Sequence, residues 1–140
     1  MERDSHSDAE IMKFYDLQNI AVVGMSKNEG KAAYYVPKYL ISHGYNVIPV
    51  NPTASEIQGR RSYPAVSSVP NNIDIVDIFR PSKDVPAVVV DAVKKEGIKV
   101  IWMQDGIYSE EAEHMARKKS IEVVYNRCML AEHVRLIGDG

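Results

Sequence analysis

The chain of 140 residues carries 17 Lys and Arg against 19 Asp and Glu, and 45% of its residues are hydrophobic. This length and composition predict one globular domain with one substantial core, and the small net charge argues against a nucleic-acid-binding surface. The single cysteine, Cys128, excludes an internal disulfide and a multi-cysteine zinc site.

The ends of the chain and its hydropathy bear on its location. No apolar run approaches the roughly 18 residues of a membrane span, and the N-terminus lacks the hydrophobic region of a signal peptide. We therefore expect a cytoplasmic protein with no membrane or nucleic-acid partner. Residues 1–7 are polar and are expected to form a disordered tail, and residues 8–140 the single domain.

Apolar periodicity predicts strands and helices that alternate along the chain. The expected strands cover residues 19–23, 46–50, 73–79, 100–103 and 121–125. The expected helices cover residues 8–14, about 35–43, 84–96, 109–119 and 129–136. Strands separated by helical stretches form parallel βαβ units, and right-handed crossovers place helices on both faces. The sequence therefore predicts an α/β fold, a Rossmann-like doubly wound sheet of about five parallel strands.

Single residues indicate where some of these helices begin and which strand lies at the edge of the sheet. Pro37 is costly inside a helix, so we expect the second helix to begin late, near residues 35–36. Pro49 cannot donate to a sheet ladder and predicts an edge strand or a bulge. Asp8 is the expected cap of the first helix, and Ser109 with two following glutamates predicts the start of the fourth.

The most informative segment is the apolar strand that stops at Gly24 and Ser26 and leads into a helix. A strand–turn–helix unit of this kind presents backbone N–H groups and a helix N-terminus to a phosphate. The hydroxyl of Ser26 and the cations Lys27 and Lys31 suit a diphosphate that is held without a metal. The alternative is a turn in which Gly24 and Ser26 serve geometry alone.

Two standard phosphate-binding motifs do not fit this loop. A P-loop has four residues between its glycines, whereas five separate Gly24 from Gly30, and Ala32 stands where a hydroxyl residue is required. In the dinucleotide fingerprint, Ser26 occupies the place of the second glycine. The next strand ends in Asn51 rather than in an acidic residue that could hold a ribose, so NAD is disfavoured.

Four other segments follow the carboxyl end of a predicted strand, and parallel strands bring such segments to one edge of the sheet. They are residues 51–52, 79–82, 102–106 and 126–128. In open α/β sheets this edge is where ligands bind.

The order and spacing of these motifs resemble the small, stand-alone CoA-binding domain family over about residues 14–138. The motifs are Gly24-x-Ser26, Gly44-Tyr45, Val50-Asn51-Pro52, Gly59-Arg60, Asp77-x-Phe79-Arg80, Trp102-x-Gln104-x-Gly106 and Asn126-Arg127-Cys128. The chain is similar, more distantly, to the N-terminal CoA-binding domain of the succinyl-CoA synthetase α subunit. The resemblance implies a Rossmann-like domain that binds coenzyme A, in a family whose members mostly lack an assigned reaction.

The resemblance also assigns each part of CoA to a stretch of this chain. The implied contacts are Gly24, Met25, Ser26 and Lys27 with the diphosphate, Asn51 and Pro52 with the adenosine, Phe79, Arg80 and Pro81 with the adenine and ribose, and Trp102, Met103 and Gln104 with the pantetheine arm. Many relatives place a basic residue after Asn-Pro to pair with the 3′-phosphate, but this chain has Thr53-Ala54. Lys31, Arg60 or Arg80 would have to replace it.

Cys128 has two interpretations. It is a small buried hydrophobe, or it is a thiol whose pKa is lowered by Arg127 and a helix N-terminus, so that it forms a mixed disulfide with CoA. No pair of histidines has metal-binding spacing, and we expect no metal and no catalytic residue.

The leading prediction is a non-catalytic protein that binds coenzyme A or an acyl-CoA. The alternatives are an NAD(P)-linked oxidoreductase on the same fold and a CoA-thiol redox protein that acts through Cys128. A protein partner or a homo-oligomer is left open.

Overall fold

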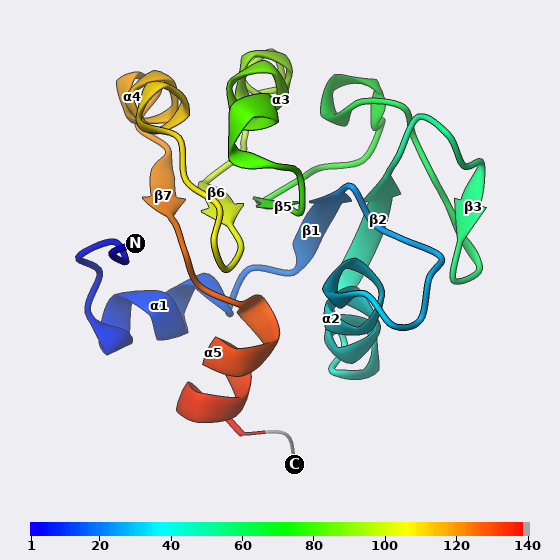
Figure 1. The fold of residues 1–140 in the computed structure, drawn as a ribbon, viewed down its shortest axis with the longest axis horizontal. Coiled ribbons are helices and arrows are strands. Elements are labelled where there is room, and N and C mark those ends of the chain that lie inside the picture. The colour runs from blue at the N-terminus through cyan, green and yellow to red at the C-terminus, as the bar shows by residue number, and fades with distance from the viewer. Residues whose placement is uncertain (139–140) are drawn as a thin grey trace.

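The computed structural model describes residues 1–138, and its centre is a parallel sheet of five strands in the order β2-β1-β5-β6-β7. The strands are β1 (Asn19–Val23), β2 (Asn46–Val50), β5 (Ile75–Ile78), β6 (Val100–Met103) and β7 (Glu122–Val124). The twisted sheet runs through the middle of the molecule (Figure 1). The predicted α/β, Rossmann-like fold is confirmed.

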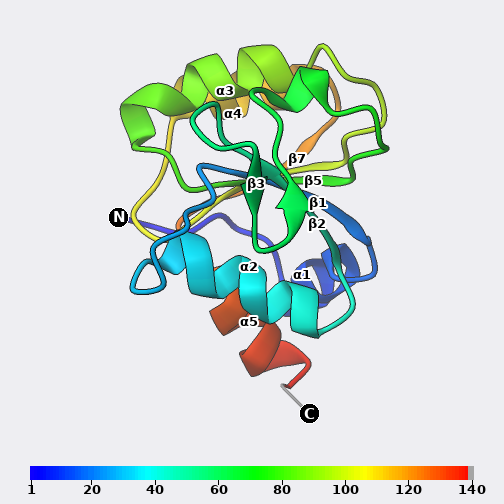
Figure 2. The same cartoon turned by 90° about the vertical axis from the view of Figure 1, so that its right-hand side faces the viewer.

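Helices cover both faces of the sheet, as Figures 1 and 2 show. On one face lie α3 (Val85–Ala92) and α4 (Glu110–Lys118), and on the other lie α1 (Asp8–Phe14), α2 (Ala32–Ser42) and α5 (Met129–Leu136). A hairpin of β3 (Glu56–Ile57) and β4 (Arg60–Arg61) and two 3₁₀ turns, η1 (Val66–Ser68) and η2 (Ser82–Asp84), complete the order. The hairpin was not expected from the sequence, because two-residue strands are too short to show a hydrophobic period.

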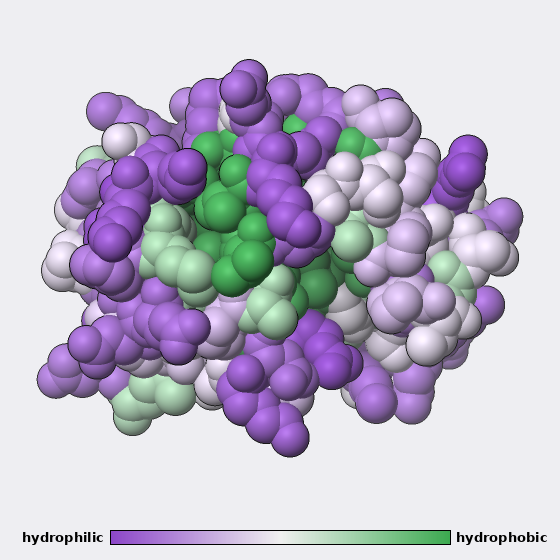
Figure 3. All heavy atoms as spheres, turned by 90° about the horizontal axis from the view of Figure 1, so that it is seen from above, coloured by the Kyte–Doolittle hydropathy of each residue, from purple (hydrophilic) through white to green (hydrophobic). Residues whose placement is uncertain are grey.

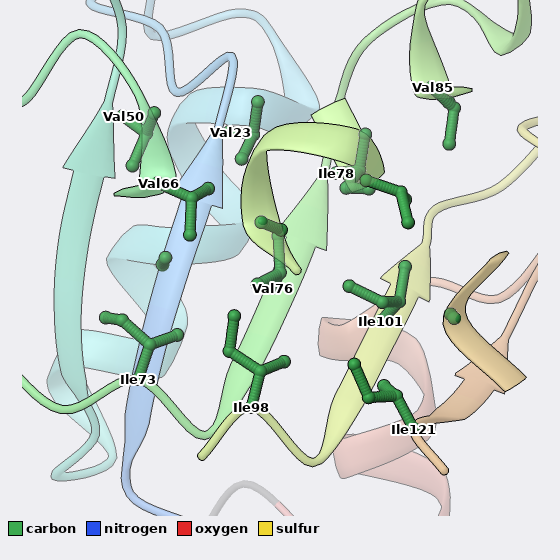
Figure 4. Packing of buried hydrophobic residues seen from close by; sticks show 14 of the residues in the cluster. Val23, Val50, Val66, Ile73, Val76, Ile78, Val85, Ile98, Ile101 and Ile121 are labelled. Carbon is green, nitrogen blue, oxygen red and sulfur yellow. The ribbon is translucent and has the colours of Figure 1, made fainter. Parts of the chain in front are cut away.

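The core consists of two apolar layers, one on each face of the sheet. Figure 4 shows the layer between the sheet and α3, to which Val76, Ile78 and Ile101 of the central strands and Val85 of α3 belong. Trp102 belongs to the opposite layer. Strands that are buried on both faces have nearly continuous apolar sequences, which is why most of them could be located in advance.

The strand order creates a switch point between β1 and β5. From β1 the chain crosses to β2 on one side, and from β5 it continues to β6 and β7 on the other. The loops that follow β1 and β5 therefore diverge and open a crevice at the carboxyl edge, which is where ligands of open α/β sheets bind.

The start of α2 differs from the expectation. It begins at Ala32 and not near residues 35–36, so that Pro37 lies in the helix interior. Pro37 has no N–H to donate to the carbonyl of Ala33, one turn earlier. That carbonyl instead accepts the backbone N–H of Ser26 at 3.0 Å. The loop after β1 thus satisfies the acceptor that the proline leaves open.

The cap of α1 also differs. Ser7, and not Asp8, is the N-cap: its hydroxyl accepts the N–H of Glu10 at 3.2 Å. The Glu10 carboxylate accepts the N–H of Ser7 in return at 2.9 Å, which completes a capping box. A carboxylate three residues into the helix was the sequence signal for this cap.

Residues 1–7, which we expected to be disordered, form no helix or strand but lie against the end of β7. The carboxylate of Asp4 accepts hydrogen bonds from the N–H of Tyr125 and from Nε of Arg127, each at 3.0 Å. Asp4 is 7% exposed and Arg127 is 6% exposed. Arg127 is a buried cation that needs a counter-charge, and the N-terminal segment supplies it.

Some of the remaining elements agree with the predictions from the sequence, and others begin or end at different residues. Pro49 lies in an edge strand, as expected. Ser109 caps α4, with its hydroxyl accepting the N–H of Ala112 at 3.1 Å. β5 and β7 are shorter than the predicted strands 73–79 and 121–125, and α3 ends at Ala92, four residues before the predicted end.

The outer face of α3 and α4 is partly apolar. Figure 3 shows apolar side chains in the middle of this face with hydrophilic side chains around them. Val90 of α3 is 48% exposed. A protein partner or a homo-oligomer stays a prediction.

None of the helices within residues 1–138 is long and apolar enough to cross a membrane.

Candidate functional site

The loop after β1 is held against the segment after β5 by a glycine. Gly24 has φ +83°, and a Cβ there would lie 3.2 Å from both Cδ of Arg80 and the carbonyl oxygen of Phe79. Its N–H donates to the carbonyl of Val50 at 2.9 Å, which ties the loop to β2 as well. The position therefore requires glycine both for its backbone conformation and for the close approach of Arg80.

Ser26 shapes the rest of the loop. Its hydroxyl oxygen accepts the N–H of Asn28 at 3.0 Å, which leaves the hydroxyl hydrogen to donate to a ligand. Its own N–H is bonded to Ala33 and is not free for a phosphate, contrary to the simplest expectation for this turn. The N–H groups of Met25 and Lys27 make no hydrogen bond within residues 1–138, and of these two residues Lys27 is the exposed one.

A hollow of about 520 Å³, here called the loop hollow, lies over this loop. The predicted site residues that line it are Gly24, Met25, Ser26, Lys27, Lys31, Asn51, Phe79 and Arg80. Three of them are cations, and no Asp or Glu of residues 1–138 lines the hollow. Cations, a hydroxyl and a helix N-terminus converge here, which is the chemistry that binds an anionic group.

A second hollow of about 480 Å³, here called the apolar hollow, adjoins the first one. The two share Gly24, Asn51, Thr53 and Arg80. The other residues that line the apolar hollow are Val23, Val50, Pro52, Pro64 and Val88. An apolar recess beside a cationic one suits a ligand that carries a ring system next to a phosphate.

Asn51 forms the wall between the hollows. Its amide nitrogen donates to the carbonyl of Met25 at 2.9 Å, which links the ends of β2 and β1. Its amide oxygen accepts both the N–H of Thr53 at 2.8 Å and the Thr53 hydroxyl at 2.7 Å. Asn51 is thus occupied by the protein and acts as a support, with Pro52 beside it.

The remaining predicted residues lie elsewhere. Pro81 lines neither hollow. Trp102, Met103 and Gln104 are 4% exposed or less, and the indole of Trp102 donates to the carbonyl of Arg127 at 2.8 Å. These three side chains underlie the sheet edge, and their contact with a pantetheine arm stays a prediction. Arg60 donates to the carbonyl of Val47 at 3.2 Å and lines a different hollow, and its pairing with the 3′-phosphate stays a prediction.

Asp77 is a buried residue that the sequence reasoning did not assign to the site. It is 0% exposed in β5, where one carboxyl oxygen accepts from the amide of Gln104. The other oxygen has no hydrogen-bond partner within residues 1–138. Burial raises the pKa of Asp77 to about 7, and the Gln104 hydrogen bond only partly opposes this shift. An acidic residue inside the apolar strand Ile75–Ile78 was the available signal.

Cys128 does not have the electrostatic environment that we expected. Burial raises its pKa, and this outweighs the N–H groups of Ala131 and Leu130, which lower it. The guanidinium of Arg127 is bonded to Asp4. The expectation of a lowered thiol pKa is therefore wrong.

A larger hollow, of about 740 Å³, runs along the outside of α4. It is lined by Glu110, Glu111, Glu113, His114 and Arg117. All of these side chains belong to one helix and three are acidic, so they do not converge on a ligand from several elements. The sheet edge remains the candidate site.

Comparison with known proteins assigns the family. The family model described as "CoA binding domain" matches residues 18–134. The YneT protein of Bacillus subtilis is 34% identical over 116 residues, which is 83% of this chain and 85% of that protein. The ADP-forming acetate–CoA ligase of Methanocaldococcus jannaschii is 32% identical over 123 residues, but this chain spans only 16% of its length.

Solved structures agree with this assignment. A hypothetical protein from Pyrococcus horikoshii OT3 has a TM-score of 0.92 at 39% identity, over 99% of this chain and 100% of that one. A protein from Thermus thermophilus has a TM-score of 0.89 at 32% identity, over 94% of this chain and 100% of that one. The family match includes the loop after β1 and the segments that line both hollows. This chain belongs to the CoA-binding domain family.

Proposed function

We propose that this protein binds CoA or an acyl-CoA and that the CoA diphosphate lies over residues 24–27. The loop hollow carries the proposal, because it gathers Lys27, Lys31 and Arg80 at the switch point of the sheet. Membership of the family indicates that the ligand is CoA or an acyl-CoA. The position of these three cations supports the placement of the CoA diphosphate in the loop hollow.

The groups around the loop suit a diphosphate. The hydroxyl of Ser26 and the N–H of Lys27 are available donors. Lys31 is the N-cap of α2 and makes no side-chain hydrogen bond to the helix, so the positive end of α2 has no side-chain partner at that cap. A diphosphate at this place would be neutralised by two ammonium groups and a helix end without a metal ion.

The apolar hollow suits the adenosine. A ligand whose diphosphate occupies the loop hollow can extend past the shared residues Asn51 and Arg80. Its adenine would then contact Val50, Pro64 and Val88. The pantetheine arm would run along the edge towards the end of β6. This arrangement gives the chain a binding role, and the proposal assigns no catalytic residue.

Ligand-dependent stabilisation tests the function. A ligand at 100 times its dissociation constant raises the free energy of unfolding by about 2.7 kcal/mol. We expect CoA and acetyl-CoA to raise the melting temperature in a thermal-shift measurement by more than NAD and NADP, which lack the pantetheine arm. Stabilisation by the nicotinamide cofactors alone would contradict the proposal.

Substitution of Ser26 tests the position. Ser26→Leu should abolish CoA binding measured by calorimetry, because the leucine side chain fills the space over the loop. Ser26→Ala is the matched control: it removes the hydroxyl but leaves the space, so we expect weaker binding rather than none. The melting temperature without ligand checks that both variants fold. An unchanged affinity in Ser26→Leu would exclude this loop as the diphosphate site.

A further inference from the structure

The cations of the site are unevenly distributed. Lys27, Lys31 and Arg80 line the loop hollow. Within residues 1–138, Arg80 is the only charged residue that lines the apolar hollow. Its guanidinium also donates to the carboxylate of Asp84 at 2.9 Å, which offsets part of its charge. Positive charge is therefore concentrated at the diphosphate and is scarce where the adenosine would lie.

The junction of the two hollows is uncharged apart from Arg80. Thr53 lines both hollows and is exposed, and its N–H and hydroxyl are both bonded to the side chain of Asn51. Ala54 follows it and adds no polar side chain. The nearby cations of the hairpin are directed elsewhere, since Arg60 is bonded to Val47 and Arg61 lies 5.2 Å from the centre of the Tyr63 ring.

We propose that this site recognises the adenosine 5′-diphosphate part of the ligand and does not discriminate for the 3′-phosphate. Its ligand class is then pantetheine esters of adenosine 5′-diphosphate, with or without a phosphate at the ribose 3′ position. The inference rests on the proposed function and adds a specificity to it.

The physical reason is the cost of leaving a phosphate unpaired. A phosphate monoester carries roughly −1.5 to −2 charges at pH 7 and gains most affinity from the cations, N–H groups and hydroxyl groups that it contacts. If the adenosine occupies the apolar hollow with its ribose at the junction, its 3′-phosphate lies beside exposed Thr53, where it stays in water and contributes little to the affinity. Its loss from the ligand should therefore change the affinity only slightly.

Calorimetry of the full chain with CoA and with 3′-dephospho-CoA tests the inference. We expect the two dissociation constants to be nearly equal, with parallel dependence on salt. A charge-assisted hydrogen bond to the 3′-phosphate would favour CoA by about tenfold or more, and such a ratio would overturn the inference while leaving the proposed function intact. Binding of neither compound would overturn the proposed function and the inference with it.

A gain of specificity gives a second, independent test. Thr53→Lys places an ammonium group at the junction and should raise the ratio of affinities in favour of CoA by about tenfold. Thr53→Met is the matched control, of similar length without the charge, and its ratio should stay near one. No change of the ratio in Thr53→Lys would show that the 3′-phosphate lies elsewhere and would contradict the inference.

Arg80 is the remaining cation at the junction, and it could bind either the diphosphate or the 3′-phosphate. If Arg80 serves the diphosphate, as we infer, Arg80→Gln should weaken CoA and 3′-dephospho-CoA by the same factor. A loss of affinity confined to CoA would mean that Arg80 binds the 3′-phosphate and would overturn the inference.

Discussion

A carboxyl group lies at the centre of the sheet, on a strand whose other side chains are aliphatic. Asp77 is fully buried, and Gln104 satisfies only one of its oxygens. Desolvation penalises the charged form, which is why its pKa rises to about 7 from the ordinary value for an aspartate. At mildly acidic pH the folded protein therefore holds a proton that the unfolded chain has released.

This proton makes stability depend on pH. Between the ordinary Asp pKa near 4 and about 7, the native state binds more protons than the unfolded state, so stability falls by about 1.4 kcal/mol for each unit of rising pH. Asp77→Asn cannot titrate and should lack this contribution. Urea denaturation of both proteins at pH 5, 6 and 7 measures the difference, since all other groups are common to both. If the free energy of unfolding changed equally with pH in both proteins, the raised pKa of Asp77 would be contradicted.

At the scale of elements, the N-terminal segment is joined to the end of β7 by a buried ion pair. Burial alone would raise the pKa of Asp4, but hydrogen bonds from Arg127 and from the N–H of Tyr125 outweigh it and hold that pKa below its usual value. Glu132 also lies 3.6 Å from the Arg127 guanidinium. The segment before α1 thus contributes a charge that the last strand and helix need.

Removal of that charge should be costly. Asp4→Asn leaves Arg127 buried with only part of its counter-charge, and we expect the free energy of unfolding to fall by about 2–4 kcal/mol. Asp8→Asn is the matched control, because the ion pair of Asp8 with Arg135 is exposed and should contribute little. Chemical denaturation of the two variants measures both effects. Equal stability of the two variants would mean that the charge of Asp4 does not stabilise the fold.

For the whole molecule, the formal net charge of −2 conceals a local excess of positive charge at the carboxyl edge of the sheet. Lys27, Lys31 and Arg80 surround one hollow, although they come from two separate loops. The fold therefore concentrates at one crevice a charge of opposite sign to that of the protein as a whole. Attraction of an anionic ligand is a property of this arrangement and not of the overall composition.

Screening by salt should weaken that attraction. The Debye length falls from about 10 Å at 0.1 M salt to about 3 Å at 1 M, and all three cations, Lys27, Lys31 and Arg80, are exposed. We expect the affinity for CoA, measured by calorimetry, to decrease steadily across this range. An affinity that stays constant would show that apolar contacts dominate binding.

Much of this architecture could be determined from the sequence alone. The strands 19–23, 46–50 and 100–103 and the helix 129–136 have the predicted bounds. Their signals are local, because a strand buried on both faces has an unbroken apolar run and a helix repeats its apolar positions every three to four residues. The order of short motifs was sufficient for the family, and most of the predicted loop residues meet in one hollow.

Only the tertiary structure decided how distant segments complete one another. Pro37 is tolerated because the N–H of Ser26 reaches the carbonyl that the proline leaves open, and Arg127 is buried because Asp4 returns to it. The same contacts separate the residues that line the hollows from those, such as Trp102, that lie beneath them. Periodicity and spacing describe neighbours along the chain. Hydrogen-bond partners and counter-charges are set by packing in three dimensions, where residues more than a hundred positions apart can touch.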